Sequence, residues 1–194
     1  MPYIKLEEHL PGITGLLEYR KDTAQPIRDL TQLLLRGPST LTEAERELIA
    51  TIVSHGNECK FCTTAHAETV NELLHETNTV QQVLGDVESA PVSEKMKALL
   101  IIAKQTQQSG KNVKPAHIER AKQAGATDLE IHDTVLIAAL FCLYNRYVDG
   151  LGTSLPKDNS YFKSLAERLA SQGYFRNPAG YDHLKATADN INPK

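Results

Sequence analysis

The sequence contains no tryptophan, and aromatic residues make up only 6% of its 194 positions. Sheets draw heavily on aromatic and β-branched side chains, whereas alanine and leucine favour helices. Because Ala, Leu and Ile supply most of the 41% hydrophobic content, the composition suits helices better than sheets.

Neither sign of charge dominates, since 21 basic residues face 24 acidic ones and the net charge is -3. No run of Lys or Arg is long enough to neutralise a series of phosphates, so nucleic acid is not an expected partner. No stretch approaches the roughly 18 apolar residues of a membrane span. The first 21 residues carry acids and prolines where a secretory signal needs a basic flank and an apolar run. We therefore expect a cytoplasmic protein that does not enter the membrane.

Cysteine is scarce, with three residues in the whole chain. A reducing compartment keeps thiols free unless they are catalytic, redox-sensing or metal-bound. Two of the three, Cys59 and Cys62, form a CxxC pair, and such a pair in the cytoplasm requires a functional explanation. Cys142 has no charged or basic neighbour in the apolar segment LIAALFCLYN and is predicted to be a buried small hydrophobe.

No linker rich in Pro, Gly or Ser divides the chain, so residues 1–194 are predicted to form a single domain. Residues 1–25 are predicted to be irregular because prolines and glycines punctuate them. Helices are predicted from apolar spacing and from start and stop residues at 27–37, 39–56, 59–74, 80–87, 93–110, 114–125, 127–152 and 161–173. The segments 39–59 and 125–144 share a threonine cap, an acidic first turn and an apolar body, which suggests a weak internal helical repeat.

The cysteine pair is predicted to open the helix that follows Gly56 and Asn57. At a helix amino terminus the free N–H groups and the dipole favour thiolate over thiol. His66 lies four residues after Cys62 and His55 four residues before Cys59, so either imidazole is a candidate base, with Glu47 as a candidate orienting group. A disulfide across so short a loop would contribute little stability.

Simpler interpretations remain for the same residues. Glu47 taken alone is more typical of a solvated carboxylate in the first turn of a helix, and His55 of a surface residue at a helix end. Zinc is the competing interpretation for the pair, because Cys59, Cys62, His66 and His55 offer two sulfurs and two nitrogens for a tetrahedral site.

The spacing of Glu47, Cys59-x-x-Cys62 and His66 resembles the signature of the AhpD-like alkylhydroperoxidases in the carboxymuconolactone decarboxylase superfamily. The segment LTEAERELIATIVSHGNECKFCTTAH resembles the peroxidase-related subgroup, and LFCLYNRYVDGLG is similar to its second characteristic segment. The resemblance runs from about residue 11 to 156, which leaves 157–194 as a carboxyl-terminal helix and tail. It implies an all-α AhpD-like fold, a homotrimer or hexamer, and a cysteine helix near a subunit interface.

The resemblance also implies a thiol peroxidase that acts on hydrogen peroxide or organic hydroperoxides and needs no cofactor or metal. In that scheme Cys62 attacks the peroxide, Cys59 resolves the sulfenic acid as a disulfide, and Glu47 and His66 relay protons. An external dithiol, such as a lipoyl or thioredoxin-like protein, then reduces the disulfide.

The sequence departs from the best-studied type of this family between the two cysteines, where Phe61 replaces a further histidine. We hypothesise that His55 substitutes for that histidine. Phe61, Leu136, Phe141 and Leu143 are candidates for an apolar pocket lining. The alternatives are a disulfide reductase or exchange protein, a member of the decarboxylase superfamily without peroxidase activity, and a zinc-binding oligomer.

Overall fold

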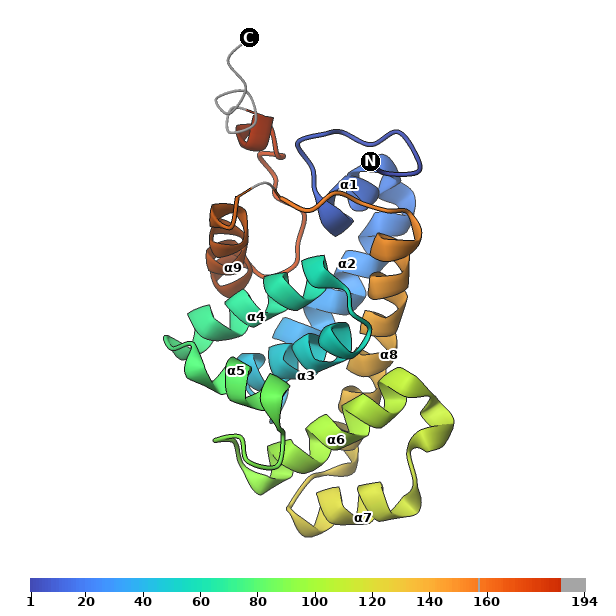
Figure 1. The fold of residues 1–194 in the computed structure, drawn as a ribbon, viewed down its shortest axis with the longest axis vertical. Helices are drawn as coiled ribbons and strands as arrows, with labels where there is room; N and C mark the ends of the chain where they lie inside the picture. The colour runs from blue at the N-terminus through green and yellow to red at the C-terminus, as the bar shows by residue number, and fades with distance from the viewer. Residues whose placement is uncertain (157, 186–194) are drawn as a thin grey trace.

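A computed structural model describes residues 1–156 and 158–185. These described residues form α-helices and one short 3₁₀-helix, without any strand, in agreement with the predicted all-α class (Figure 1). The elements, in chain order, are α1 (Gly12–Tyr19), α2 (Lys21–Arg36), α3 (Glu43–Gly56), α4 (Lys60–Leu74), α5 (Asn78–Gly85), α6 (Glu94–Gln108), η1 (Gly110–Asn112), α7 (Pro115–Gln123), α8 (Asp128–Gly150) and α9 (Ser160–Gln172).

The prediction of an irregular amino-terminal segment is wrong, because α1 and the first turns of α2 lie within residues 1–25. Pro26 sits inside α2, where it removes one backbone hydrogen bond. Burial of one face of the helix, through side chains such as Ala24, Thr31 and Leu35, offsets that loss. Gly12 opens α1 with a φ of +56°, and a Cβ there would collide with the Phe61 ring, so a glycine permits both the conformation and the close approach.

Helix α3 occupies the centre of the fold and packs against α2, α4, α6 and α8 (Figure 1). It begins with the predicted capping box, in which the Thr42 side chain accepts from the Glu45 N–H and the Glu45 carboxylate accepts from the Thr42 N–H. Ten consecutive residues from Ala44 to Val53 include no exposed side chain. An element buried on every side can hold a charged side chain away from water, provided that partners surround it.

The second copy of the predicted repeat begins in the same way. Thr127 and Glu130 form a capping box at the start of α8. The Glu130 carboxylate also accepts from Lys95 at 2.7 Å and from Thr40 at 2.9 Å, so it ties α6 and the loop before α3 to α8. Helices α3 and α8 then pack directly against each other.

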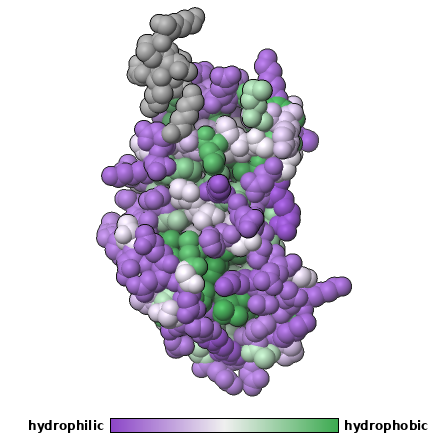
Figure 2. Space-filling view, viewed as in Figure 1, coloured by the Kyte–Doolittle hydropathy of each residue, from purple (hydrophilic) through white to green (hydrophobic). Residues whose placement is uncertain are grey.

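Helix α9 packs along α4, and the segment that follows it returns toward α2 and α3 (Figure 1). The face drawn in Figure 2 is mainly hydrophilic, with apolar residues gathered near α5 and α6. No helix of the described residues is both long enough and apolar enough to cross a membrane.

Candidate active site

The two cysteines stand at the beginning of α4, as predicted. Cys59 is the residue that caps the helix, and Cys62 lies in the first turn. The chain enters this turn through Glu58, which adopts a φ of 58°, a conformation that is uncommon outside glycine. Both thiols are free and buried, and they belong to a small apolar cluster that joins α1, α4, α8 and α9.

The two sulfurs interact with each other. The pKa of the Cys59 thiol is lowered, first by hydrogen bonding with the Cys62 thiol, against burial and the nearby Asp149 carboxylate. The pKa of Cys62 is raised, first by the same contact and then by burial. Cys59 is therefore the thiol of the pair that ionises more readily, and its ionisation makes that of Cys62 harder. Asn145 of α8 is 1% exposed and favours the ionised form of Cys62.

Glu47 is fully buried in α3, so the expectation of a solvated carboxylate is wrong. Three donors surround it: His66 Nδ1 lies 2.6 Å from Oε2, while the Arg36 guanidinium and the Tyr174 hydroxyl lie 2.6 Å and 2.5 Å from Oε1. Burial alone would raise the pKa of Glu47, but the interactions with His66, Arg36 and Tyr174 lower it below its ordinary value. Glu47 is therefore a carboxylate at neutral pH.

This charge fixes the tautomer of His66. An ionised carboxylate only accepts hydrogen bonds, so the nitrogen facing it, Nδ1, must carry a proton. In the neutral ring Nε2 is then the basic atom. The ring also meets the edge of Phe141 at a centroid distance of 4.5 Å, which limits its rotation. Glu47 thus orients His66 as a carboxylate orients the histidine of a catalytic triad.

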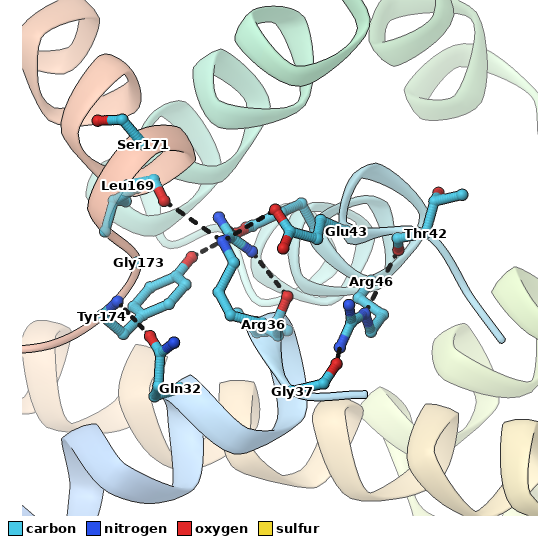
Figure 3. Close-up of polar contacts among 12 residues, drawn as sticks. Gln32, Arg36, Gly37, Thr42, Glu43, Arg46, Leu169, Ser171, Gly173 and Tyr174 are labelled. Atoms are coloured by element: carbon cyan, nitrogen blue, oxygen red, sulfur yellow. Dashed lines mark hydrogen bonds and ion pairs between the residues drawn. The ribbon is translucent and has the colours of Figure 1, made fainter. Parts of the chain in front are cut away.

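Two residues of this cluster were not predicted from the sequence. Arg36, at the end of α2, bonds to Glu47, lies within 3.4 Å of Glu43, and donates to the Leu35 and Leu169 carbonyls (Figure 3). Its guanidinium carbon lies 5.0 Å from the centroid of the Tyr174 ring. Burial raises the pKa of the Tyr174 hydroxyl well above its ordinary value, and the Glu47 charge raises it further, so the hydroxyl remains a donor. No spacing motif in the sequence indicates Tyr174, because this residue reaches α3 only through the tertiary packing of α9.

The helix face that carries Cys62 and His66 opens on a cavity of about 80 Å³. Cys62 lines this cavity, whereas Cys59 does not. The two residues are four apart on α4 and therefore share a face. No hydrogen bond joins them within the described part of the chain. Phe61 lines the cavity as predicted, but Leu143 is 50% exposed and Leu136 packs against the main core instead.

The remaining predicted residues lie outside this cluster. His55 is exposed at the end of α3 and is not part of the cavity lining. Cys142 is only partly buried: its sulfur lies 3.6 Å from the Asn57 amide and 3.8 Å from the Gln107 carbonyl. Across residues 1–156 and 158–185, no three His, Cys, Asp or Glu side chains are grouped to hold a metal ion. The zinc ligand set allowed by the sequence is therefore not assembled.

Comparison with known proteins gives a family match for part of the chain and two solved structures with the same fold. Residues 21–105 match the carboxymuconolactone decarboxylase family. The match covers less than half of the chain, from α2 into α6. It includes Arg36, Glu47, Cys59, Cys62 and His66, whereas Asn145 and Tyr174 lie beyond it.

Two solved structures share the AhpD-like fold. One is an uncharacterized peroxidase-related protein with an alkylhydroperoxidase AhpD core from Ralstonia eutropha JMP134, with 24% identity, a TM-score of 0.71 and 80% of each chain covered. The other is an uncharacterized peroxidase-related protein from Silicibacter sp. TM1040, with 22% identity, a TM-score of 0.70, and coverage of 76% of this chain and 77% of the other. No curated protein sequence matches the chain significantly.

Proposed function

We propose that this chain is a thiol peroxidase in which Cys62 reduces hydrogen peroxide or an organic hydroperoxide. The observation that carries the proposal is that Cys62 and His66 line one cavity while a buried Glu47 orients His66. The peroxidase-related descriptions of the two similar structures support the same class.

The reaction follows from the positions of these groups. Cys62, as thiolate, attacks the terminal peroxide oxygen, and the O–O bond breaks to give a sulfenic acid and an alkoxide or hydroxide. His66 Nε2 takes the Cys62 proton through a bridging water or the peroxide itself, and it returns that proton to the leaving oxygen. Glu47 stabilises the imidazolium that forms in between. Cys59 then attacks the Cys62 sulfur, the S–O bond breaks, and water leaves as the disulfide forms.

The position of Cys62 supports this division of roles, because Cys62 is the sulfur that faces the cavity and the peroxide reaches it first. In the resting pair the contact between the sulfurs favours ionisation of Cys59 rather than of Cys62, so Cys62 must lose its proton to His66 before it attacks. Because Cys59 ionises the more readily of the two, it is suited to supply the thiolate that resolves the sulfenic acid. Asn145, acting on Cys62, is a positioning residue for the Cys62 thiolate.

The decisive experiment counts thiols by mass spectrometry before and after one equivalent of peroxide. Wild type should lose the Cys59 and Cys62 thiols together, as a disulfide. Cys59→Ser should retain a sulfenic acid at Cys62 that dimedone traps, and Cys142→Ser is the matched control that should behave as wild type. A protein in which neither Cys59 nor Cys62 is oxidised by peroxide does not have this function.

A disulfide reductase or exchange protein is the second candidate, because the same contact between Cys59 and Cys62 suits thiol–disulfide exchange. It predicts rapid reaction with a disulfide substrate and slow reaction with peroxide. Stopped-flow measurement of both rates on the reduced protein separates the two activities.

The proposed cycle needs an external dithiol, such as a lipoyl or thioredoxin-like protein, and a reducing compartment, so we propose a cytoplasmic location. We also propose assembly into a homotrimer or hexamer. Leu33, Leu129 and Leu143 are between 50% and 63% exposed in the single chain, and an interface would remove such side chains from water. Light scattering coupled to gel filtration tests the assembly, and a monomer at all concentrations would contradict it.

A further inference from the structure

The cavity in front of Cys62 combines an apolar wall with positive charge. Hydrophobic and aromatic side chains dominate its lining, and the charged side chains among its lining residues are two arginines, Arg28 and Arg168. No Asp or Glu belongs to the described lining. A volume of about 80 Å³ exceeds the roughly 10–15 Å³ that a single water needs, so the space admits a small organic group.

Arg28 already has a carboxylate partner. Its guanidinium lies 3.0 Å from Glu18, and Arg176 from the segment after α9 lies 2.8 Å from the same carboxylate. The Lys21 ammonium lies 4.0 Å from the same Glu18 carboxylate. The single negative charge of Glu18 therefore faces more than one cation, and this side of the cavity keeps a positive excess.

Among the residues that the structure describes, Arg168 is the cavity-lining arginine that has no carboxylate partner. It is half-buried on α9, and its guanidinium donates to the Gly173 carbonyl at 3.4 Å. Within residues 1–156 and 158–185 no Asp or Glu lies within 4.0 Å of it. Its charge favours ionisation of the Tyr161 and Tyr174 hydroxyls and so opposes the rise that burial causes in the pKa of each. Because Arg168 lines the cavity, its guanidinium is available to a ligand there.

We propose that the preferred substrate is an organic hydroperoxide that carries a carboxylate, bound with its carboxylate at Arg168 and its peroxide at Cys62. This inference rests on the proposed peroxidase function. A guanidinium binds a carboxylate through two parallel hydrogen bonds, and the apolar wall contacts the hydrocarbon between the two groups. Attack by Cys62 breaks the O–O bond, oxidises the sulfur to a sulfenic acid, and releases a hydroxy acid once His66 has protonated the alkoxide.

Hydrogen peroxide would gain nothing from this arrangement. It has no carboxylate for Arg168 and no hydrocarbon for the lining, so its binding uses neither feature of the cavity. A neutral hydroperoxide uses the apolar wall alone. The order of reactivity should therefore be carboxylated hydroperoxide, neutral organic hydroperoxide and hydrogen peroxide.

The test compares linear ω-hydroperoxy carboxylic acids of increasing chain length with their methyl esters. The acid and the ester at each length differ in the charge that Arg168 would recognise. The reduced protein is mixed with each compound in single turnover, so that no reductant enters the measurement. We expect the acid of the best-fitting length to oxidise Cys62 roughly tenfold faster than its ester at low concentration.

Variants of α9 assign the preference to one side chain. Arg168→Gln should lower the ratio of the acid rate to the ester rate roughly tenfold, to about one, whereas Arg168→Lys should retain part of the preference. Lys163→Gln is the matched control, since it removes a positive charge from an exposed position of α9 that does not line this cavity, and it should keep the full preference.

Three results would overturn the inference. Equal rates for acid and ester in wild type at every chain length would show that charge is not recognised. A preference that survives in Arg168→Gln, or that is lost equally in Lys163→Gln, would show that Arg168 does not provide it. Failure of all acids and esters to oxidise Cys62 would remove the proposed function itself, and the inference with it.

Discussion

The hydroxyl of Tyr174 donates a hydrogen bond of 2.5 Å to the carboxylate of Glu47, a residue 127 positions earlier in the chain. Glu47 lies in the segment that matches the carboxymuconolactone decarboxylase family, and Tyr174 lies outside it. The segment after α9 therefore completes the set of donors around the buried carboxylate that orients His66. Four predictions follow from this arrangement and from the framework that supports it.

Replacing Tyr174 with phenylalanine keeps the ring and removes the hydroxyl. Glu47 then loses one donor, which should destabilise the fold by roughly 1–3 kcal/mol and raise the pKa of Glu47. Because the carboxylate orients His66 only when ionised, the acid limb of the rate of Cys62 oxidation should move to higher pH. Tyr19→Phe removes a hydroxyl from an exposed ring and should change neither value. An unchanged pH profile in Tyr174→Phe would show that the hydroxyl does not act on Glu47.

Arg36 and Glu47 form a buried ion pair, with their side chains 5% and 0% exposed. Glu47→Gln removes the buried carboxylate from Arg36 and leaves only the partly exposed Glu43, and breaking a buried pair in this way typically costs about 3–5 kcal/mol. Glu43→Gln is the control, because Glu43 contacts the same arginine from a site that is 38% exposed, where a pair contributes roughly 0–1 kcal/mol. Urea unfolding measures both changes. Similar losses in the two variants would mean that burial does not decide the strength of these contacts.

The two candidate histidines should behave differently on substitution. His66→Ala should slow peroxide reduction roughly 100-fold or more, because removal of a positioned base costs about that factor. His55→Ala should leave the rate unchanged, because His55 is exposed and does not line the cavity. The measurement is the single-turnover rate of Cys62 oxidation. A slow His55→Ala protein would restore the hypothesis that His55 compensates for Phe61.

Glu130 should make the fold sensitive to acid. Burial raises the pKa of this carboxyl, but bonds from Lys95, the Thr127 N–H and Thr40 lower it to about 2. In the unfolded chain the pKa is about 4.3, so the unfolded state takes up a proton first as the pH falls. The stability contributed by Glu130 is therefore complete above about pH 4.3 and disappears toward pH 2, an effect of roughly 2–3 kcal/mol.

The Glu130→Gln variant isolates this contribution. It should be less stable than wild type at pH 7. Between pH 5 and pH 3 its free energy of unfolding should fall less than that of wild type, by an amount equivalent to a shift of about one to two pKa units. Glu8→Gln, at an exposed position, is the matched control and should follow the wild-type curve. Thermal unfolding across this pH range gives the comparison, and parallel curves for wild type and Glu130→Gln would contradict the assignment.

Local rules account for most of the helices. Thr42 with Glu45 and Thr127 with Glu130 are three residues apart, and each pair forms the capping box that its spacing indicates. At residues 1–25 the local rules fail because tertiary packing outweighs them. Gly12 and Gly15 disfavour helix when only neighbouring residues are considered, but the close approach of Gly12 to Phe61 and the burial of one face of α1 outweigh that preference.

The candidate site is likewise only partly predictable from the sequence. The positions of Cys59, Cys62 and His66 on one helix follow from the sequence, because three- and four-residue spacings place side chains on one helix face. The burial of Glu47 does not follow from it, since a carboxylate in the second turn of a helix is equally suited to water. His66, Arg36 and Tyr174 together keep it ionised, and the last two come from the end of α2 and from beyond α9.

The sequence by itself determined the helical class, the capping of α3 and α8, and the placement of a cysteine pair and a histidine at the start of one helix, because each depends on residues within one or two turns. Only the tertiary structure decided which of the candidate side chains meet. It left His55 outside the cavity lining, enclosed Glu47 beside Arg36, and brought Tyr174 and Arg168 to the cavity. The reason is physical: the ionisation of a buried group depends on every charge and donor that packing brings to it, however distant in the chain.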